Sequence, residues 1–111
     1  METAIETHGE VAVFDVPHES VDASNANDFK KELKACCETS QKVVLDLGQV
    51  QFVDSAGLGA MVWAFRQLSG DGGDMRICNV NGSVRALFEL VRMHKLLSVF
   101  ESREDALKSF Q

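Results

Sequence analysis

The stretch from Lys42 to Leu68, KVVLDLGQVQFVDSAGLGAMVWAFRQL, decides the fold of this chain. It begins with a short apolar, β-branched run over Val43–Leu47, which is typical of a buried strand. From Ser55 onward the apolar residues recur at steps of three and four, which predicts one buried face of a helix. The residues of that face are Leu58, Met61, Val62, Phe65 and Leu68. The stretch therefore predicts a central strand, a loop and a helix.

Asp54 and Ser55 lie where this loop enters the predicted helix. Both residue types are favoured there because their side-chain oxygens accept hydrogen bonds from the first, unpaired amides of a helix. Gly57 and Gly59 follow in the first turn, where each glycine costs about 1 kcal/mol relative to alanine. That cost indicates a second use for the bare backbone. The two candidates are tight packing of the helix on the sheet and close approach by a partner.

The string DSAGLG at residues 54–59, after a strand that ends LDL, resembles the phosphorylation motif of the STAS domain. The resemblance is closest to free-standing bacterial anti-sigma-factor antagonists. In that family the serine directly after the aspartate is the phosphoacceptor, and it maps onto Ser55. Many relatives have Ser or Thr where this chain has Ala56, which removes a possible second acceptor. The resemblance assigns support of the phosphosite or contact with the partner to Asp54, Ala56, Gly57, Leu58 and Gly59.

The resemblance covers nearly the whole chain and implies a non-enzymatic regulator in a partner-switching pathway. The unphosphorylated form would bind an anti-sigma factor that is also a serine kinase. That kinase would use ATP to phosphorylate Ser55 and end the complex, and a metal-dependent phosphatase of the PP2C type would restore it. Three alternatives stand beside this function. They are an accessory STAS subunit of a lipid-transport ATPase, a switch for a non-sigma pathway such as biofilm or secretion control, and a nucleotide-binding module.

The length of 111 residues predicts one domain over residues 1–111, with 45% hydrophobic and 25% charged residues as in ordinary globular proteins. The formal charge of −6 argues against nucleic-acid binding, because an acidic surface repels phosphate backbones. The apolar runs fall far short of a membrane span, and no positively charged, apolar leader opens the chain. We therefore expect a cytoplasmic protein that does not insert into membranes.

The rest of the chain alternates strands with helices. Residues 5–16 predict a hairpin that Pro17 closes, and a stripe of apolar residues predicts a helix over about 24–38. A strand over 75–80, a helix capped by Ser83, a short edge strand over 96–100 and a last helix after Ser102 follow. The predicted buried face of the helix after Ser83 is Val84, Leu87, Phe88 and Val91.

The resulting order, β-β-α-β-α-β-α-β-α, predicts an α/β fold with about four helices and a mixed, mostly parallel sheet of about five strands. The resemblance adds the specific STAS topology. Residues 18–23 read as a polar connection in which Asp22 partly matches a family motif near the partner surface. Asp22 or Ser24 would also suit the cap of the next helix. Trp63 lies off the apolar stripe, and both an exposed interface anchor and partial burial remain open.

Enzymatic chemistry has little support in the sequence. The nucleophile pattern G-x-S-x-G is absent, and none of His8, His18 and His94 is placed as an obvious base for Ser55. The scattered His and Cys residues lack metal-ligand spacing, so we expect no metal and no cofactor. The cysteines Cys36, Cys37 and Cys78 are expected to be reduced, partly buried thiols, because a disulfide between adjacent cysteines on a helix would strain the backbone.

Overall fold

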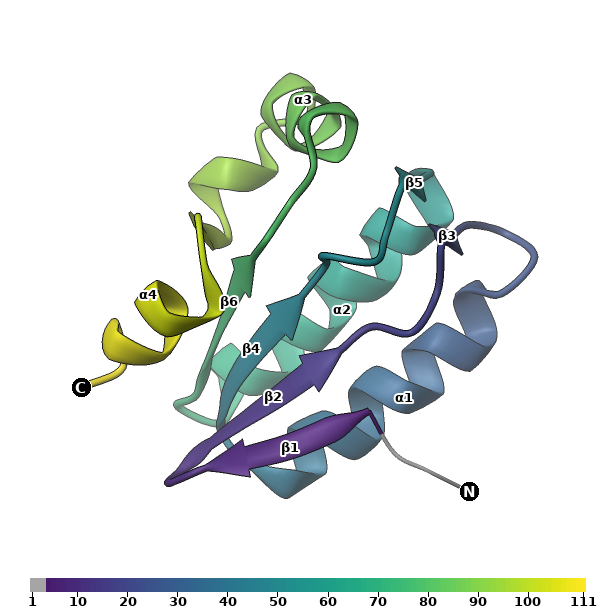
Figure 1. The fold of residues 1–111 in the computed structure, drawn as a ribbon. Coiled ribbons are helices and arrows are strands. Elements are labelled where there is room, and N and C mark those ends of the chain that lie inside the picture. Colours follow the sequence, from purple (N-terminus) through teal and green to yellow (C-terminus); the bar gives the residue numbers. More distant parts are fainter. Residues whose placement is uncertain (1–3) are drawn as a thin grey trace.

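The computed structural model describes residues 4–111, and a mixed sheet forms the centre of this part of the chain (Figure 1). The strand order is β1-β2-β4-β6-β7. β1 pairs antiparallel with β2, and all later pairs in this sheet are parallel. The strands are β1 (Ile5–His8), β2 (Val11–Asp15), β4 (Lys42–Asp46), β6 (Asp74–Cys78) and β7 (Ser98–Phe100). The predicted hairpin and five-stranded mixed sheet are confirmed.

Within the described residues four α-helices surround this sheet, as predicted. Helices α1 (Ala26–Thr39) and α2 (Ser55–Gly70) lie side by side on one face, and the short helix α4 (Arg103–Lys108) covers the other (Figure 1). Helix α3 (Gly82–Leu90) and the 3₁₀ turn η1 (Met93–Lys95) connect β6 to β7. The connections that contain α1 and α2 both leave the sheet at the carboxyl ends of its parallel strands. The N-termini of both helices therefore lie near that end of the sheet.

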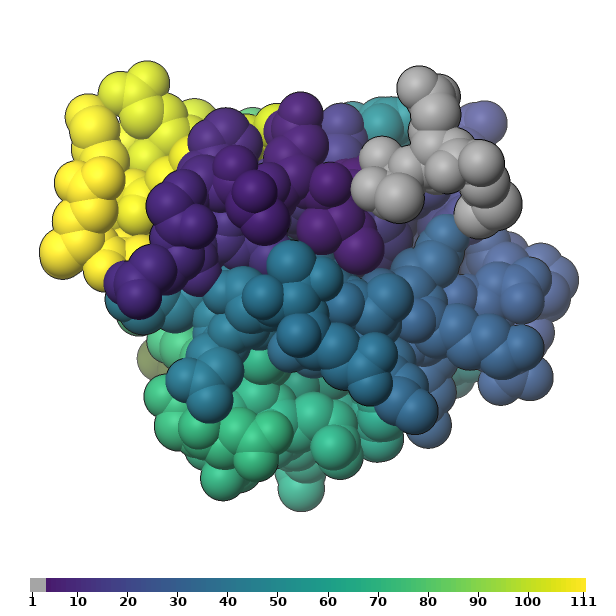
Figure 2. Space-filling view, turned by 90° about the horizontal axis from the view of Figure 1, so that it is seen from below, coloured from purple at the N-terminus to yellow at the C-terminus, as the bar shows by residue number. Residues whose placement is uncertain are grey.

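The core follows the two-residue period of the strands, because successive side chains point to opposite faces of the sheet. One set faces α1 and α2 and includes Ala12, Phe14, Val43, Leu45, Met75 and Ile77. The alternate set faces α4 and includes Val11, Val13, Val44 and Cys78. Seen from the end where β2 and β4 begin, the purple hairpin lies beside the yellow C-terminal segment (Figure 2). The same view shows the blue end of α1 against the green end of α2.

The segments expected to be connections contain a second, two-stranded parallel sheet. It pairs β3 (Ser20–Val21) with β5 (Phe52–Val53). Each strand has two residues, too few to show a recognisable period in the sequence. The pair lies beyond the carboxyl end of the central sheet, directly before α2 (Figure 1). It therefore fixes the point at which the chain enters that helix.

Three of the finer predictions were wrong. Asn81, not Ser83, caps α3, because its side chain accepts a hydrogen bond from the Val84 amide at 2.9 Å. Val91 follows the end of α3 and is 48% exposed instead of buried. Neither Asp22 nor Ser24 caps α1, which begins after Asn25 and has no side-chain cap.

The three cysteines are free, as expected, with Cys36 and Cys78 buried and Cys37 partly buried. Burial, assisted by the neighbouring Cys37 sulfur, raises the pKa of the Cys36 thiol to about 12. Burial, with the Asp46 carboxylate second, likewise raises the pKa of Cys78 to about 12. Such thiols carry almost no thiolate at neutral pH, so they behave as apolar packing groups. In the described part of the chain no helix has the length and apolarity to cross a membrane.

Candidate functional site

Asp54 is the structural anchor of the DSAGLG motif. It occupies the N-cap of α2, and its Oδ1 accepts hydrogen bonds from the amides of Ala56 at 2.9 Å and Gly57 at 3.1 Å. Its Oδ2 accepts a third from the Ala23 amide at 3.0 Å. The hydrogen bond from the Gly57 amide has the largest effect on the pKa of the Asp54 carboxyl and lowers it. Burial, the second-largest effect, raises the pKa, but the Ala23 and Ala56 amides lower it further, so it stays below its ordinary value. Asp54 is thus an anion at neutral pH that ties the loop before α1 to the start of α2.

Ser55 is the first residue of α2 and is exposed. Asp54 and Ala56 on either side of it are partly buried, and Gly57 and Leu58 are buried, with Leu58 only 8% exposed in the core. The fold therefore presents the Ser55 hydroxyl at the surface while the residues around it hold the backbone in place. A hydroxyl in this position is accessible to another protein, which is the first requirement of a phosphoacceptor.

The structure separates the roles of the two glycines. A Cβ on Gly57 would lie 2.5 Å from the carbonyl oxygen and 2.9 Å from Cγ1 of Val21, so α2 packs against β3 only because this position is bare. A Cβ on Gly59 would have nothing within 4 Å. Gly57 thus serves packing within the protein, whereas Gly59 leaves an open, exposed patch of helix backbone.

Asp22 lies in the loop that Asp54 holds. Its carboxylate accepts hydrogen bonds from the Ser24 amide at 3.0 Å and the Ser24 hydroxyl at 2.6 Å, and its own amide donates to Asn25 Oδ1 at 2.9 Å. The adjacent residue Ala23 makes the bond to Asp54. The structure therefore brings Asp22 to the same surface as the DSAGLG motif, where it shapes the loop.

Phe52 is a neighbour of the site that the sequence prediction missed. It lies on β5, two residues before Asp54, and is 54% exposed. A hollow of about 250 Å³ adjoins it, lined by Gln51, Phe52, Val53, Ser83, Val84 and Leu87. No two-residue period marked Phe52 in the sequence, because Val50 and Val53 are buried whereas both residues between them, Gln51 and Phe52, are exposed.

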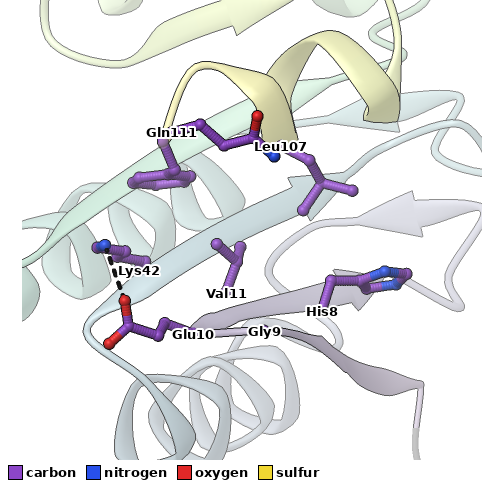
Figure 3. Close-up of a pocket in the computed structure, with 8 residues that line it drawn as sticks. His8, Gly9, Glu10, Val11, Lys42, Leu107 and Gln111 are labelled. Atoms are coloured by element: carbon purple, nitrogen blue, oxygen red, sulfur yellow. Dashed lines mark hydrogen bonds and ion pairs between the residues drawn. The ribbon is translucent and has the colours of Figure 1, made fainter.

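A larger cavity, of about 610 Å³, is lined by residues that all lie outside the DSAGLG motif (Figure 3). It is formed by the β1–β2 turn, the start of β4 and the end of the chain, and Lys42 and Glu10 form an ion pair of 3.5 Å across its edge. Ser55 follows β5 beyond the carboxyl ends of the parallel strands, whereas this cavity is at their amino ends. The cavity is therefore no part of the motif surface.

The arrangement around Ser55 differs from that of a serine nucleophile. His18 Nε2 lies 2.7 Å from the Glu32 carboxylate, and His8 lies 3.7 Å from that of Glu6. Among residues 4–111 no hydrogen bond joins a histidine to Ser55. The same residues contain no cluster of three or more His, Cys, Asp or Glu side chains that could hold a metal ion. An exposed hydroxyl next to a fixed carboxylate is what the geometry provides.

Comparison with known proteins places this geometry in a family. BtrV of Bordetella bronchiseptica is 33% identical over 92 residues, which are 82% of this chain and 79% of that protein. The anti-sigma F factor antagonist of Paenibacillus polymyxa is 30% identical over 71 residues, 64% of this chain and 61% of that one.

A crystal structure of an anti-sigma factor antagonist from Mycobacterium paratuberculosis superposes with a TM-score of 0.86 at 23% identity. The superposition covers 97% of this chain and 92% of that one. The family model described as "STAS domain" matches residues 2–106. From its sequence and its fold together, this chain belongs to the STAS domain family.

Proposed function

We propose that this chain is an anti-sigma-factor antagonist that phosphorylation of Ser55 switches off. The unphosphorylated form binds an anti-sigma factor that is also an ATP-dependent serine kinase, and that kinase transfers phosphate to Ser55. A PP2C-type phosphatase returns the chain to its binding form. The observation that carries the proposal is the exposed Ser55 hydroxyl at the head of α2, beside the fixed carboxylate of Asp54. The relatives named as antagonists supply the class of partner.

The physical effect of the phosphate is local. Phosphorylation adds about −1.5 to −2 charges at neutral pH. Free amides at a helix N-terminus can partly neutralise such a charge, but the amides of Ala56 and Gly57 already donate to Asp54. The dipole of α2 still stabilises a phosphate on Ser55, whereas the Asp54 carboxylate repels it. The new charge therefore stays oriented to water.

A partner that covers Ser55 must remove water from this charge. A thousandfold loss of affinity requires about 4 kcal/mol, which is within the cost of an uncompensated charge in an interface. No change of fold is needed, because Ser55 is already exposed in the unmodified protein and the phosphate is added at the surface. Phosphorylation would thus change affinity while leaving the free domain folded.

The test compares two substitutions at Ser55 in calorimetric titrations with the candidate kinase. Ser55→Ala keeps the site neutral and should bind as the wild type does. Ser55→Asp introduces a permanent charge and should weaken binding by at least about a hundredfold, because a single buried, unpaired charge costs several kcal/mol. Tight binding of the Asp variant would contradict the switch. Incubation with kinase and ATP, followed by mass mapping, should place one phosphate on Ser55 of the wild type and none on Ser55→Ala.

A further inference from the structure

The surface between α1 and α2 carries an unpaired positive charge that the Ser55 switch does not explain. A cavity of about 320 Å³ on this surface is lined by Asn27, Lys30, Lys31, Lys34 and Trp63. Among residues 4–111 none of the three lysines forms an ion pair with a carboxylate, although the chain has a formal charge of −6. In an acidic protein, three neighbouring free lysines form a distinct positive patch.

Trp63 is the centre of this patch. It is partly buried, and the Lys30 ammonium lies over its indole ring at 4.6 Å from the centroid. A second hollow, of about 220 Å³, lies on the other side of Trp63 and includes Glu38 and Asp71 in its lining. Lys34 lines both hollows, and the two carboxylates belong only to the second. Positive charge therefore prevails in the first hollow, where Lys30 and Lys31 lie toward the N-terminus of α1. A partly exposed Trp flanked by cations is a common anchor in protein interfaces.

The patch is continuous with Ser55. Ser55, Gly59 and Trp63 follow one another at four-residue steps, so they lie along one stripe of α2. At 1.5 Å rise per residue Trp63 lies about 12 Å along the helix from Ser55. Gly59 lies between them with open space above its backbone. A segment of a partner that covers Ser55 can therefore run toward the lysines over Gly59, which adds no side chain to this stripe.

We propose that this groove, lined by Asn27, Lys30, Lys31, Lys34 and Trp63, receives an acidic segment of the protein partner. The inference extends the proposed function, because it takes that partner to be the protein that covers Ser55. Carboxylates are the complementary charge for lysines that form no ion pair within the chain, and the indole ring offers an apolar surface beside them. The acidic segment would contribute on-rate and orientation, while Ser55 controls whether the complex forms.

The single Trp of the chain makes the groove directly observable. An acidic hexapeptide of alternating Glu and Asp, blocked at both ends, is titrated at low salt while Trp63 fluorescence is recorded. We expect a saturable change that fades as salt is added, since the Debye length falls to about 10 Å at 0.1 M. A basic peptide of equal length should leave the emission unchanged. The absence of a saturable change with the acidic peptide would overturn the proposal.

Two double variants separate the groove from overall charge. Lys30→Gln/Lys34→Gln and the control Lys95→Gln/Lys108→Gln each remove two positive charges, which takes the formal charge from −6 to −8. Lys95 is exposed, and Lys108 is an exposed residue of α4 paired with Glu104. The groove variant should bind the peptide about tenfold more weakly, and the control should change less than about twofold. Equal effects of the two variants would show that the groove is not the site.

The failures of the two proposals are distinguishable. At about 0.1 M salt, Ser55→Asp should bind the peptide within about twofold of the wild type, because a Debye length of about 10 Å screens its charge at about 12 Å. If Ser55→Asp binds the kinase tightly while the peptide results hold, the switch is wrong and the groove remains. If Ser55→Asp loses the kinase but the groove variant binds kinase and peptide normally, the groove alone is wrong. Equal quenching by inorganic phosphate or ATP at matched ionic strength would also overturn the assignment to an acidic protein segment.

Discussion

Gly57 and Gly59 occupy the same turn of α2 and differ in what surrounds them. A Cβ at Gly57 would meet the Val21 carbonyl at 2.5 Å, so Gly57→Ala should force α2 away from β3 and destabilise the protein by about 1–3 kcal/mol. Gly59→Ala meets nothing within 4 Å and should stabilise it by about 0.5–1 kcal/mol through helix propensity. Urea unfolding of both variants measures the difference. Equal effects would mean that the contact with Val21 does not constrain the helix.

Asp54 should give the protein a pH-dependent share of its stability. Its pKa is lowered in the folded state, chiefly by the Gly57 amide. The stabilisation is therefore present above the pKa of the unfolded chain and is lost as the pH falls through the folded value. We expect Asp54→Ala to be less stable than the wild type at pH 7, and the gap to narrow below about pH 4. Ser55→Ala, which removes no ionisable group, is the control and should show a pH-independent difference in urea midpoints.

The DSAGLG motif itself was predictable, because a preferred cap residue and the change from strand to helix period are local signals. The structural role of each residue in the motif was not predictable. The packing role of Gly57 depends on Val21, which is 36 residues earlier in the chain, and the third bond of Asp54 goes to Ala23. Such contacts depend on the pairing of β3 with β5, which joins two segments far apart in the sequence.

At the scale of elements, the start of α3 shows how a local signal can be read wrongly. Asn81 and Ser83 are both preferred caps, and the sequence favoured Ser83. The structure gives the extended backbone to Asn81, whose Oδ1 accepts from Val84 and whose Nδ2 donates to the Val50 carbonyl at 2.9 Å. The hydrogen bond from Asn81 Nδ2 to the Val50 carbonyl favours Asn81 as the cap, because it joins the start of α3 to the loop before β5. No pattern in the sequence reports that loop's position.

Asn81 should therefore matter more than Ser83. Asn81→Ala removes the cap and leaves the Val50 carbonyl without this donor, and we expect a loss of about 1–2 kcal/mol. Ser83→Ala removes an exposed hydroxyl that lies 3.3 Å from the Gln51 carbonyl and 3.1 Å from Asn81 Oδ1, and should cost less than about 0.5 kcal/mol. Chemical denaturation measures the free energy of unfolding of the two variants and shows which is less stable. A larger loss for the Ser83 variant would restore it as the cap.

On the scale of the whole molecule, one buried carboxylate connects the central strand to the last helix. Asp46 at the end of β4 is 5% exposed. Its oxygens accept hydrogen bonds from the Gly48 amide at 2.9 Å, Asn79 at 3.0 Å and Arg103 Nε at 3.0 Å. Arg103 at the start of α4 also contacts Asp15 at 3.5 Å and Glu6 at 3.1 Å. A single guanidinium thus links α4 to the first, second and central strands.

The sequence indicated Asp46 only as part of a strand. Its partner Arg103 is 57 residues away, and no pattern of charges around either residue predicts the contact. Because Asp46 and Arg103 are so far apart in the sequence, their contact fixes α4 against the central strand. Helix α4 has six residues, too few for a stable helix in isolation, so its position on the second face depends on docking. Docking combines the apolar contacts of Ala106 with the anchor at Arg103.

Removing Arg103 should cost more than its partly exposed position suggests. Arg103→Met leaves the Asp46 charge buried with fewer donors, and we expect a loss of about 2–3 kcal/mol, below the usual range for fully buried pairs. Asp46→Asn/Arg103→Met removes the unpaired charge as well, so it should unfold at higher urea than Arg103→Met alone. Arg85→Met, which breaks an exposed pair with Glu101 at 3.5 Å, is the matched control and should cost less than about 0.5 kcal/mol. A double variant that is less stable than Arg103→Met would show that the buried charge does not limit the anchoring of α4.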